Sequence, residues 1–172
     1  MKTEYLLNEQ VERVLSALTT SNRLVMRLCL HTGLRIGDAL ALKPEQLKPR
    51  FWIREQKTNK PRIVGIPEPL LSDLRAHAGK IWVFESRLDP AKHRTRQAVW
   101  ADVKRAAKLF RLPQNVGPHS ARKVYAVELM RKYGDLERVR RALNHGSVIV
   151  TQIYALADML LEQKAKKPRR RA

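Results

Sequence analysis

The sequence predicts a mainly α-helical domain with one small antiparallel β-sheet, which is an α+β fold class. Apolar residues recur three or four positions apart through most of the chain, as they do on the buried face of a helix. One early pair of short runs is instead rich in aromatic and β-branched residues and is joined by a polar turn. The 172 residues, of which 44% are hydrophobic, are enough for one domain with a substantial core.

The first part of the chain is expected to form two amphipathic helices and a shorter third one. Asn8 is placed to cap the first helix, and its apolar face is formed by Val11, Val14, Leu15 and Leu18. The second helix begins near Asn22 and ends at Gly33, because glycine readily adopts the left-handed conformation that terminates helices. Cys29 lies on the apolar face of this helix and is therefore expected in the core. The short helix covers about residues 38–42.

The next segment is expected to form the sheet. Pro44 and Pro49 interrupt the helical pattern, and the chain becomes extended after them. Residues 51–53 and 63–66 are the expected strands, and the basic turn 56–61 joins them into a hairpin.

Helical spacing returns in the second half of the chain. The expected helices cover residues 69–78, 95–110, 119–133, 135–143 and 148–166. Pro118 suits the first turn of a helix, Gly134 ends that helix, and Asp135 caps the one after it. The helix over 95–110 has one apolar stripe that is expected to face the core: Val99, Val103, Ala106, Ala107 and Phe110.

The charge of the chain predicts a polyanionic partner. Lys and Arg number 35 against 16 Asp and Glu, which gives a formal net charge of +19 at pH 7. Such an excess supplies the salt-dependent affinity that proteins have for nucleic acids. The last nine residues hold six basic residues and no acid. We therefore expect one folded domain over residues 1–163 and a disordered basic tail over 164–172.

The composition also limits where the protein is expected to act. One cysteine rules out an internal disulfide framework and fits a reducing compartment. No apolar run reaches the roughly 18 residues of a membrane span, and the N-terminus has no signal-peptide pattern. We expect a soluble protein of the cytoplasm with no membrane partner.

Four short segments place a cation, an imidazole or a phenol at a helix end or in a tight turn. They are residues 32–35, 56–58, 119–122, and 143–145 followed nine residues later by Tyr154. His119 and Arg122 are three apart on one expected helix, so both can contact a single phosphate. Each segment alone has an ordinary explanation, such as an ion pair between Arg35 and Asp38.

Taken together and in order, these segments resemble a known family. The strings that carry the resemblance are TGLRIGDALAL, EQKTNKPRIVGIP, GPHSARKVYAVEL and LNHGSVIVTQIY. They resemble the catalytic domain of the tyrosine recombinases, also called the phage integrase family, over about residues 22–158. The resemblance implies that family's fold, which is likewise mostly helical with a small early sheet.

The resemblance implies a set of catalytic residues: Arg35, Lys57, His119, Arg122, His145 and Tyr154. In the implied reaction the nucleophile Tyr154 forms a covalent 3′-phosphotyrosine with DNA, and the strand is later rejoined. Planar guanidinium groups suit a phosphodiester that gathers negative charge during attack. Of the other residues, His145 donates a hydrogen bond to the phosphate, His119 accepts the phenol proton and Lys57 protonates the leaving 5′ oxygen. Asp38 is expected to support the region of Arg35.

The same resemblance implies double-stranded DNA as partner and a homo-tetramer on that DNA, with no cofactor, no metal and no small-molecule substrate. It also implies a bacterial or phage-encoded protein that is associated with the nucleoid. Asn144 replaces the usual glycine of the last box, and Lys123 stands where a second histidine is common. Lys60 lies in the same turn as Lys57 and is an alternative to it. The family's usual N-terminal DNA-clamping domain has no counterpart, so we expect either a fragment or a short member. Residues 155–161 fit a helix that docks on a neighbouring subunit or packs on its own core.

Two other functions remain open at this point. A non-catalytic DNA-binding regulator on the same scaffold would explain the charge, but it has no need of a tyrosine at this spacing. An RNA-binding protein of ribosomal type would expose aromatic residues on a sheet. We expect Trp52, Trp82 and Trp100 to lie in the core, because their sequence neighbours are apolar.

Overall fold

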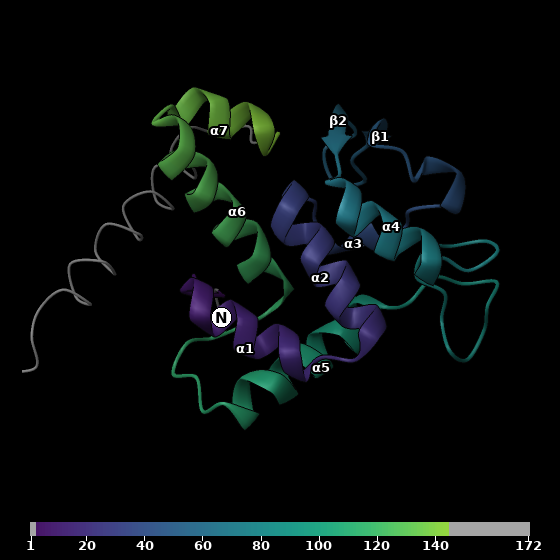
Figure 1. Ribbon diagram of the computed structural model, residues 1–172, viewed down its shortest axis with the longest axis horizontal. Helices are drawn as coiled ribbons and strands as arrows, with labels where there is room; N and C mark the ends of the chain where they lie inside the picture. The colour runs from purple at the N-terminus through teal and green to yellow at the C-terminus, as the bar shows by residue number, and fades with distance from the viewer. Residues whose placement is uncertain (1–2, 145–172) are drawn as a thin grey trace, which may run out of the picture. The chain divides into compact units, whose positions relative to one another are not determined.

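The computed structural model describes residues 3–144 of the chain (Figure 1). In chain order its elements are α1 (Asn8–Ala17), α2 (Thr20–Thr32), α3 (Ile36–Leu40), the 3-10 helix η1 (Pro44–Gln46), β1 (Arg50–Arg54), β2 (Pro61–Gly65), α4 (Glu68–His77), α5 (Arg96–Leu109), α6 (Pro118–Tyr133) and α7 (Leu136–Ala142). The chain divides into two compact units, Met1–Tyr125 and Ala126–Ala172, and α6 contributes to both. The expected class, mainly helical with a small antiparallel sheet, is confirmed.

Helix α2 lies at the centre of the first unit. It contacts α1, α3 and α4, and α5 contacts α1 and α3. Val25, Leu28 and Cys29 of α2 are fully buried, so the expected core position of this cysteine is confirmed. Burial raises the pKa of the Cys29 thiol to about 12, which keeps it protonated and unreactive.

The start of α2 is held by a carboxylate from α5. Asp102 accepts hydrogen bonds from the Thr19 backbone N–H at 3.0 Å, the Thr19 hydroxyl at 3.1 Å and the Asn22 amide at 2.7 Å. The first of these bonds satisfies a backbone N–H at the helix start, where such groups have no partner within the helix, and the other two satisfy side-chain donors. Asp102 also pairs with Arg105 at 2.6 Å. The N-terminus of α2 is therefore fixed to the middle of α5.

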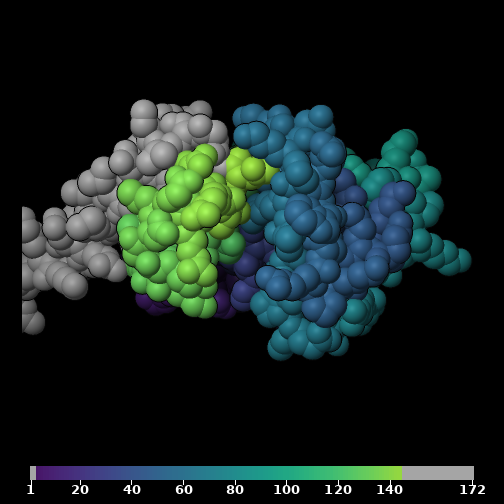
Figure 2. Space-filling model, turned by 90° about the horizontal axis from the view of Figure 1, so that it is seen from above, coloured from purple at the N-terminus to yellow at the C-terminus, as the bar shows by residue number. Residues whose placement is uncertain are grey.

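The hairpin of β1 and β2 has one buried face and one exposed face. Its antiparallel register pairs Phe51 with Val64, which are buried, and Trp52 with Ile63, which are 65% and 49% exposed. Side chains alternate between the two faces of a strand, so Phe51 and its neighbour Trp52 cannot both face the core. In the space-filling view the blue segment that includes β1 lies at the surface (Figure 2).

The structure corrects several expectations. The helix start is Asn8, but Leu7 holds the capping position, because the Gln10 side chain accepts the Leu7 N–H at 3.0 Å and the chain is already helical at Asn8. Helix α3 begins two residues earlier than expected, directly after the extended Arg35. The core positions expected for the tryptophans are wrong: Trp52 and Trp100 are exposed and Trp82 is half-buried. Phe110, at the end of the α5 stripe, is half-buried.

Other expectations for single residues are confirmed. Gly33 and Gly134 end α2 and α6 with φ of 63° each. Asp135 caps α7 by accepting the backbone N–H groups of Glu137 and Arg138 at 2.9 and 3.1 Å. Across residues 3–144, no helix is long and apolar enough to cross a bilayer. The expected helix over 148–166 and the tail over 164–172 lie outside the described residues.

Candidate active site

The sequence Thr32-Gly33-Leu34-Arg35 turns the chain sharply at the end of α2. The Thr32 hydroxyl donates to the Leu28 carbonyl at 2.6 Å, and the Gly33 N–H donates to the Cys29 carbonyl at 2.8 Å. Gly33 has a left-handed φ, and a Cβ at this position would clash with the ring of Tyr125. Leu34 is then buried, so Arg35 leaves the core at the start of α3.

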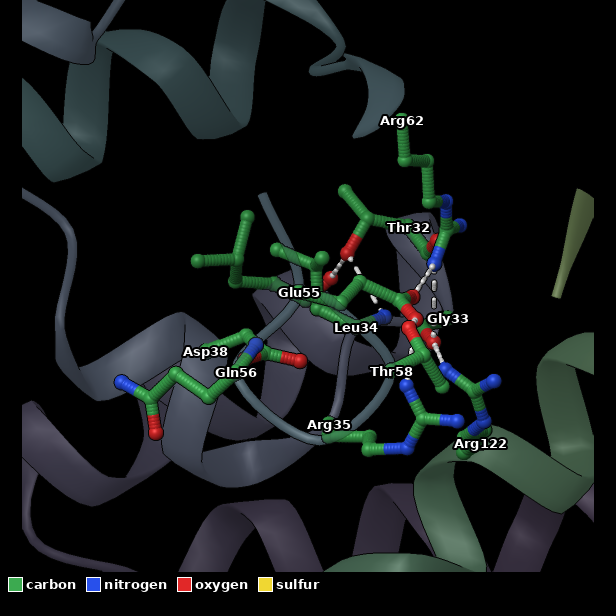
Figure 3. A network of polar contacts seen from close by, with 11 residues as sticks. Thr32, Gly33, Leu34, Arg35, Asp38, Glu55, Gln56, Thr58, Arg62 and Arg122 are labelled. Atoms are coloured by element: carbon green, nitrogen blue, oxygen red, sulfur yellow. Dashed lines mark hydrogen bonds and ion pairs between the residues drawn. The ribbon is translucent and has the colours of Figure 1, made fainter. Parts of the chain in front are cut away.

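Two buried arginines bind the carbonyl groups at this end of α2. Arg122 of α6 donates to the Gly33 carbonyl, and Arg62 of β2 donates to the carbonyls of Thr32 and Gly33. The last carbonyls of a helix have no partner within the helix and carry partial negative charge, so cations are stabilised there. Arg62 and Arg122 are 9% and 6% exposed. Their guanidinium groups gather around the Thr32–Gly33 peptide in Figure 3.

Glu55, at the end of β1, links this cluster to the hairpin turn. Its fully buried carboxylate pairs with Arg35 at 2.5 Å and with Arg62 at 3.5 Å, and it accepts the Thr58 hydroxyl at 2.8 Å. Burial alone would raise the pKa of Glu55, but the hydrogen bonds from Arg35 and Thr58 outweigh burial and lower it. Glu55 is therefore ionised and holds Arg35 beside the turn that carries Lys57.

Replacing Glu55 with Ala is expected to lower the free energy of unfolding by about 3–5 kcal/mol, because it leaves a buried arginine without its charge partner. Urea unfolding followed by circular dichroism measures the loss. Glu55→Gln keeps the shape and is expected to lose less. The exposed pair of Glu9 and Arg13 supplies the control, since Glu9→Ala should cost at most about 1 kcal/mol. Equal losses in Glu55→Ala and Glu9→Ala would contradict this account.

Asp38 binds the hairpin turn and does not pair with Arg35. Its Oδ1 accepts the backbone N–H of Gln56 at 2.9 Å, directly before Lys57. The ion pair considered between Arg35 and Asp38 is replaced by the pair of Arg35 with Glu55. Asp38 thus ties α3 to the hairpin, and its side chain is 7% exposed. Asp38 was expected to support the region of Arg35. It does so through the neighbouring hairpin turn and not through Arg35 itself.

A pocket of about 480 Å³ opens beside these residues. Its lining comes from α3, the hairpin turn, α5 and the start of α6, with these residues: Arg35, Ile36, Gly37, Asp38, Gln56, Lys57, Arg96, Gln97, Trp100, Pro118 and His119. Of the two lysines in the turn, Lys57 lines the pocket, while Lys60 is not among the described lining residues. The pocket therefore brings together two guanidiniums, an ammonium and an imidazole.

His119 stands on the first turn of α6 with its side chain exposed at the pocket. Partial desolvation lowers the pKa of His119, and the nearby charges of Arg122, Arg35 and Lys57 lower it further. A lowered pKa leaves the imidazole neutral at pH 7, and a neutral imidazole can accept a proton.

The pH dependence of stability provides a test of the His119 environment. In the unfolded chain a histidine takes up a proton near pH 6.5, whereas His119 in the folded chain does so only at lower pH. The contribution of His119 to the free energy of unfolding is therefore fully present above about pH 6.5, and it is lost as the pH drops toward the folded pKa. The pKa values of His31 and His77 are also lowered, and both residues remain in the His119→Gln variant. The variant lacks only the His119 contribution, so it should lose less stability between pH 7 and 5 than the wild type. Urea unfolding across this range measures the difference, and identical pH slopes would contradict it.

The expected site residues are thus brought together in part. Arg35, Lys57 and His119 line one pocket, and Arg122 lies at the Gly33 carbonyl beside them. Arg122 is not among the described residues that line the pocket. His145 and Tyr154 lie outside the described residues. Sequence reasoning missed Glu55 and Arg62, whose partners lie 20 and 30 positions away, and no local pattern marks them.

The described residues also bear on metal binding. Within residues 3–144, no group of three or more His, Cys, Asp and Glu side chains is placed to hold a metal ion.

Comparison with known proteins identifies relatives over nearly the whole chain. The model of the phage integrase family matches residues 4–160. The integrase of Escherichia phage P2 is 32% identical over 155 residues, which are 90% of this chain and 43% of that protein. Tyrosine recombinase XerD of Mycobacterium tuberculosis (strain ATCC 25618 / H37Rv) is 29% identical over 159 residues, covering 83% of this chain and 50% of that protein. This chain spans about half the length of these relatives.

Solved structures show the same fold. XerH site-specific recombinase bound to palindromic difH substrate, in a post-cleavage complex, matches with a TM-score of 0.75 and 25% identity, over 96% of this chain and 53% of that one. The catalytic domain of bacteriophage HP1 integrase matches with a TM-score of 0.69 and 20% identity, over 98% of this chain and 97% of that one. The match over residues 4–160, the relative at 32% identity and the shared fold establish that the chain belongs to the phage integrase family.

Proposed function

We propose that this chain is the catalytic part of a site-specific DNA recombinase, which cleaves and rejoins DNA strands through a covalent 3′-phosphotyrosine. The observation that carries the proposal is the single pocket lined by Arg35, Lys57 and His119 in a chain of this family. Each of the three residues suits one task in cleaving a phosphodiester.

Arg35 is the group that binds the scissile phosphate. Its guanidinium is half-buried, with a side chain 18% exposed, and it is oriented by Glu55. A positioned guanidinium at a phosphate stabilises the negative charge that gathers in the transition state, and it needs little reorganisation to do so. Arg122 is the second guanidinium of the mechanism and is supported by its position on the face of α6 that also carries His119.

The proton transfers are assigned to His119, Lys57 and the phenol of Tyr154. Tyr154 attacks phosphorus and its proton passes to the neutral His119, because a tyrosine with a pKa near 10 is a weak nucleophile while protonated. The bond from phosphorus to the 5′ oxygen breaks, and Lys57 gives that oxygen a proton. His145 donates a hydrogen bond to the same phosphate. Rejoining reverses these steps, and because the phosphotyrosine keeps a phosphodiester bond, no cofactor is required.

A suicide substrate tests the proposal directly. The protein is incubated with duplex DNA that carries its recombination site and a nick beside the cleavage position, so that a short fragment diffuses away after cleavage and the adduct accumulates. We expect a protein–DNA species that survives denaturant and forms equally well in EDTA, because no metal takes part in the proposed steps. Salt-sensitive DNA binding without any adduct would instead support the non-catalytic DNA-binding regulator.

We propose double-stranded DNA as the partner and a homo-tetramer on that DNA as the working assembly. The net charge of +19 supports the first, and so do relatives such as XerH, whose structure is described as bound to difH substrate. Deleting the residues after Asp158 and measuring DNA-bound stoichiometry by analytical ultracentrifugation tests the second.

A cytoplasmic location stays a prediction. The corrected position of Trp52 removes the earlier argument against an RNA-binding protein, but family membership favours DNA.

A further inference from the structure

Trp100 is an aromatic side chain that the proposed reaction does not use, yet it lines the pocket of Arg35, Lys57 and His119. It comes from α5 and is 52% exposed. A single exposed aromatic side chain is common on protein surfaces, but this one lies in the same pocket as the cations, where its flat apolar face is available to a ligand. The other exposed tryptophan, Trp52, lies on the outward face of β1 and is not among the described residues that line the pocket.

The Trp100 ring is held in place by its neighbours on α5 and before α6. Lys104, one turn along α5, places its ammonium 5.7 Å from the ring centroid. Lys104 is itself hydrogen-bonded to the Asn115 side chain. A cation against one face of an aromatic ring favours that ring orientation. Trp100 therefore offers the rest of its exposed ring to a ligand.

The pocket is larger than a phosphate requires. Its volume of about 480 Å³ falls in the range typical of sites that bind drug-sized organic molecules. Arg35 and Lys57 line the pocket from the start of α3 and from the hairpin turn, while Trp100 lines it from α5 together with a further cation, Arg96. A ligand that fills the pocket thus needs an anionic part and a flat, apolar part beside it.

We propose that Trp100 forms a nucleobase subsite, in which the base next to the scissile phosphate leaves the stack of the duplex and lies on the indole ring while Arg35 and Lys57 hold the phosphate. This inference rests on the proposed function, because it places the reacting phosphate in this pocket. Every base has a flat π face, so aromatic stacking binds nucleotides with little dependence on sequence. The subsite positions the phosphate for attack by fixing the nucleotide attached to it.

Small phosphodiesters test this subsite without knowledge of the recombination site. Dimethyl phosphate carries the anionic group alone, while a dinucleoside monophosphate such as dApdA adds the bases. We expect the wild type to bind dApdA roughly five- to hundred-fold more tightly than dimethyl phosphate, since stacking on an aromatic side chain contributes a factor of this size. Two-dimensional NMR of the backbone N–H groups measures both dissociation constants, in the wild type and in variants that lack the Trp100 indole.

The tryptophan spectra contain their own control. Adding dApdA should shift the indole signal of Trp100 and leave that of Trp52 unchanged. In the Trp100→Ala variant, dApdA and dimethyl phosphate should bind equally, whereas Trp52→Ala should keep the preference and Trp100→Phe should keep most of it. Because half of the Trp100 side chain is exposed, the variant is expected to fold, and circular dichroism checks this.

The outcomes separate this inference from the function on which it rests. Loss of dimethyl phosphate binding in Arg35→Ala supports the phosphate site, whatever Trp100 does. If the wild type binds dApdA no better than dimethyl phosphate, or if Trp100→Ala keeps the preference, the nucleobase subsite is overturned while the phosphate site stands. If the wild type binds neither compound, both the subsite and the phosphate site are overturned.

Discussion

Replacing Tyr154 with Phe is expected to abolish the covalent protein–DNA adduct altogether, because phenylalanine has no oxygen to attack phosphorus. The measurement is the suicide-substrate assay, with the adduct resolved on a denaturing gel. DNA binding should persist, since the phenol contributes little to the electrostatic attraction that comes from Lys and Arg residues. The prediction separates an enzyme from a DNA-binding regulator in one experiment.

A matched control is available in the described part of the chain. Tyr133, near the end of α6, is 37% exposed, and Arg138 lies over its ring at 3.6 Å from the centroid. Tyr133→Phe removes the same atom at a site outside the proposed machinery, so it should form the adduct at the wild-type rate. An adduct of normal yield from Tyr154→Phe would show that another residue is the nucleophile.

Replacing Arg35 with Ala is expected to slow cleavage by at least roughly 100-fold, because one positioned donor to a developing oxyanion is typically worth a factor of 10²–10³ in rate. Arg35→Lys keeps the charge but loses the planar fork, so it should recover only part of the rate. Single-turnover measurement of adduct formation at saturating protein isolates the cleavage step from binding.

The effect on DNA affinity should be much smaller. Removing one phosphate contact lowers the slope of log affinity against log salt by about 0.9, and the many other basic residues maintain the rest. Arg27→Ala is the control, since Arg27 pairs with Asp73 at 2.6 Å on the surface of the first unit. Equal loss of cleavage in Arg35→Ala and Arg27→Ala would mean that the rate depends on total charge rather than on a positioned group.

Local sequence patterns reveal some helix ends and exposed positions of this fold. The turn at Gly33 was predictable, because a glycine after an apolar helical repeat marks a left-handed helix end. The exposure of Trp52 and Trp100 was also available from the pattern. Trp52 follows the buried Phe51 on a strand, and Trp100 lies outside the stripe that begins with Val99 on α5. Apolar neighbours in sequence are therefore a weaker guide than periodicity.

Other features of the site could not be predicted in this way. Glu55 is a single acid at a strand end, and its contacts with Arg35 and Arg62 exist only once α3 and the hairpin are folded together. Likewise, the resemblance assigned Lys57 and kept Lys60, in the same turn, as an alternative, whereas the structure puts Lys57 at the pocket. Pairings of this kind depend on tertiary structure. The position of a charged residue in the sequence does not indicate which distant residue it contacts.

Helix α2 links α5 to the arginine cluster formed by Arg62 and Arg122. Asp102 of α5 binds its first turn, and Arg62 and Arg122 bind the carbonyls at its last. Its 13 residues form a stiff rod of about 20 Å, at about 1.5 Å per residue. Helix α2 therefore connects α5, which carries Trp100, to the arginine cluster at the Thr32–Gly33 peptide. Inserting or deleting one residue in α2 would rotate one end against the other by about 100° and displace the arginine cluster relative to α5.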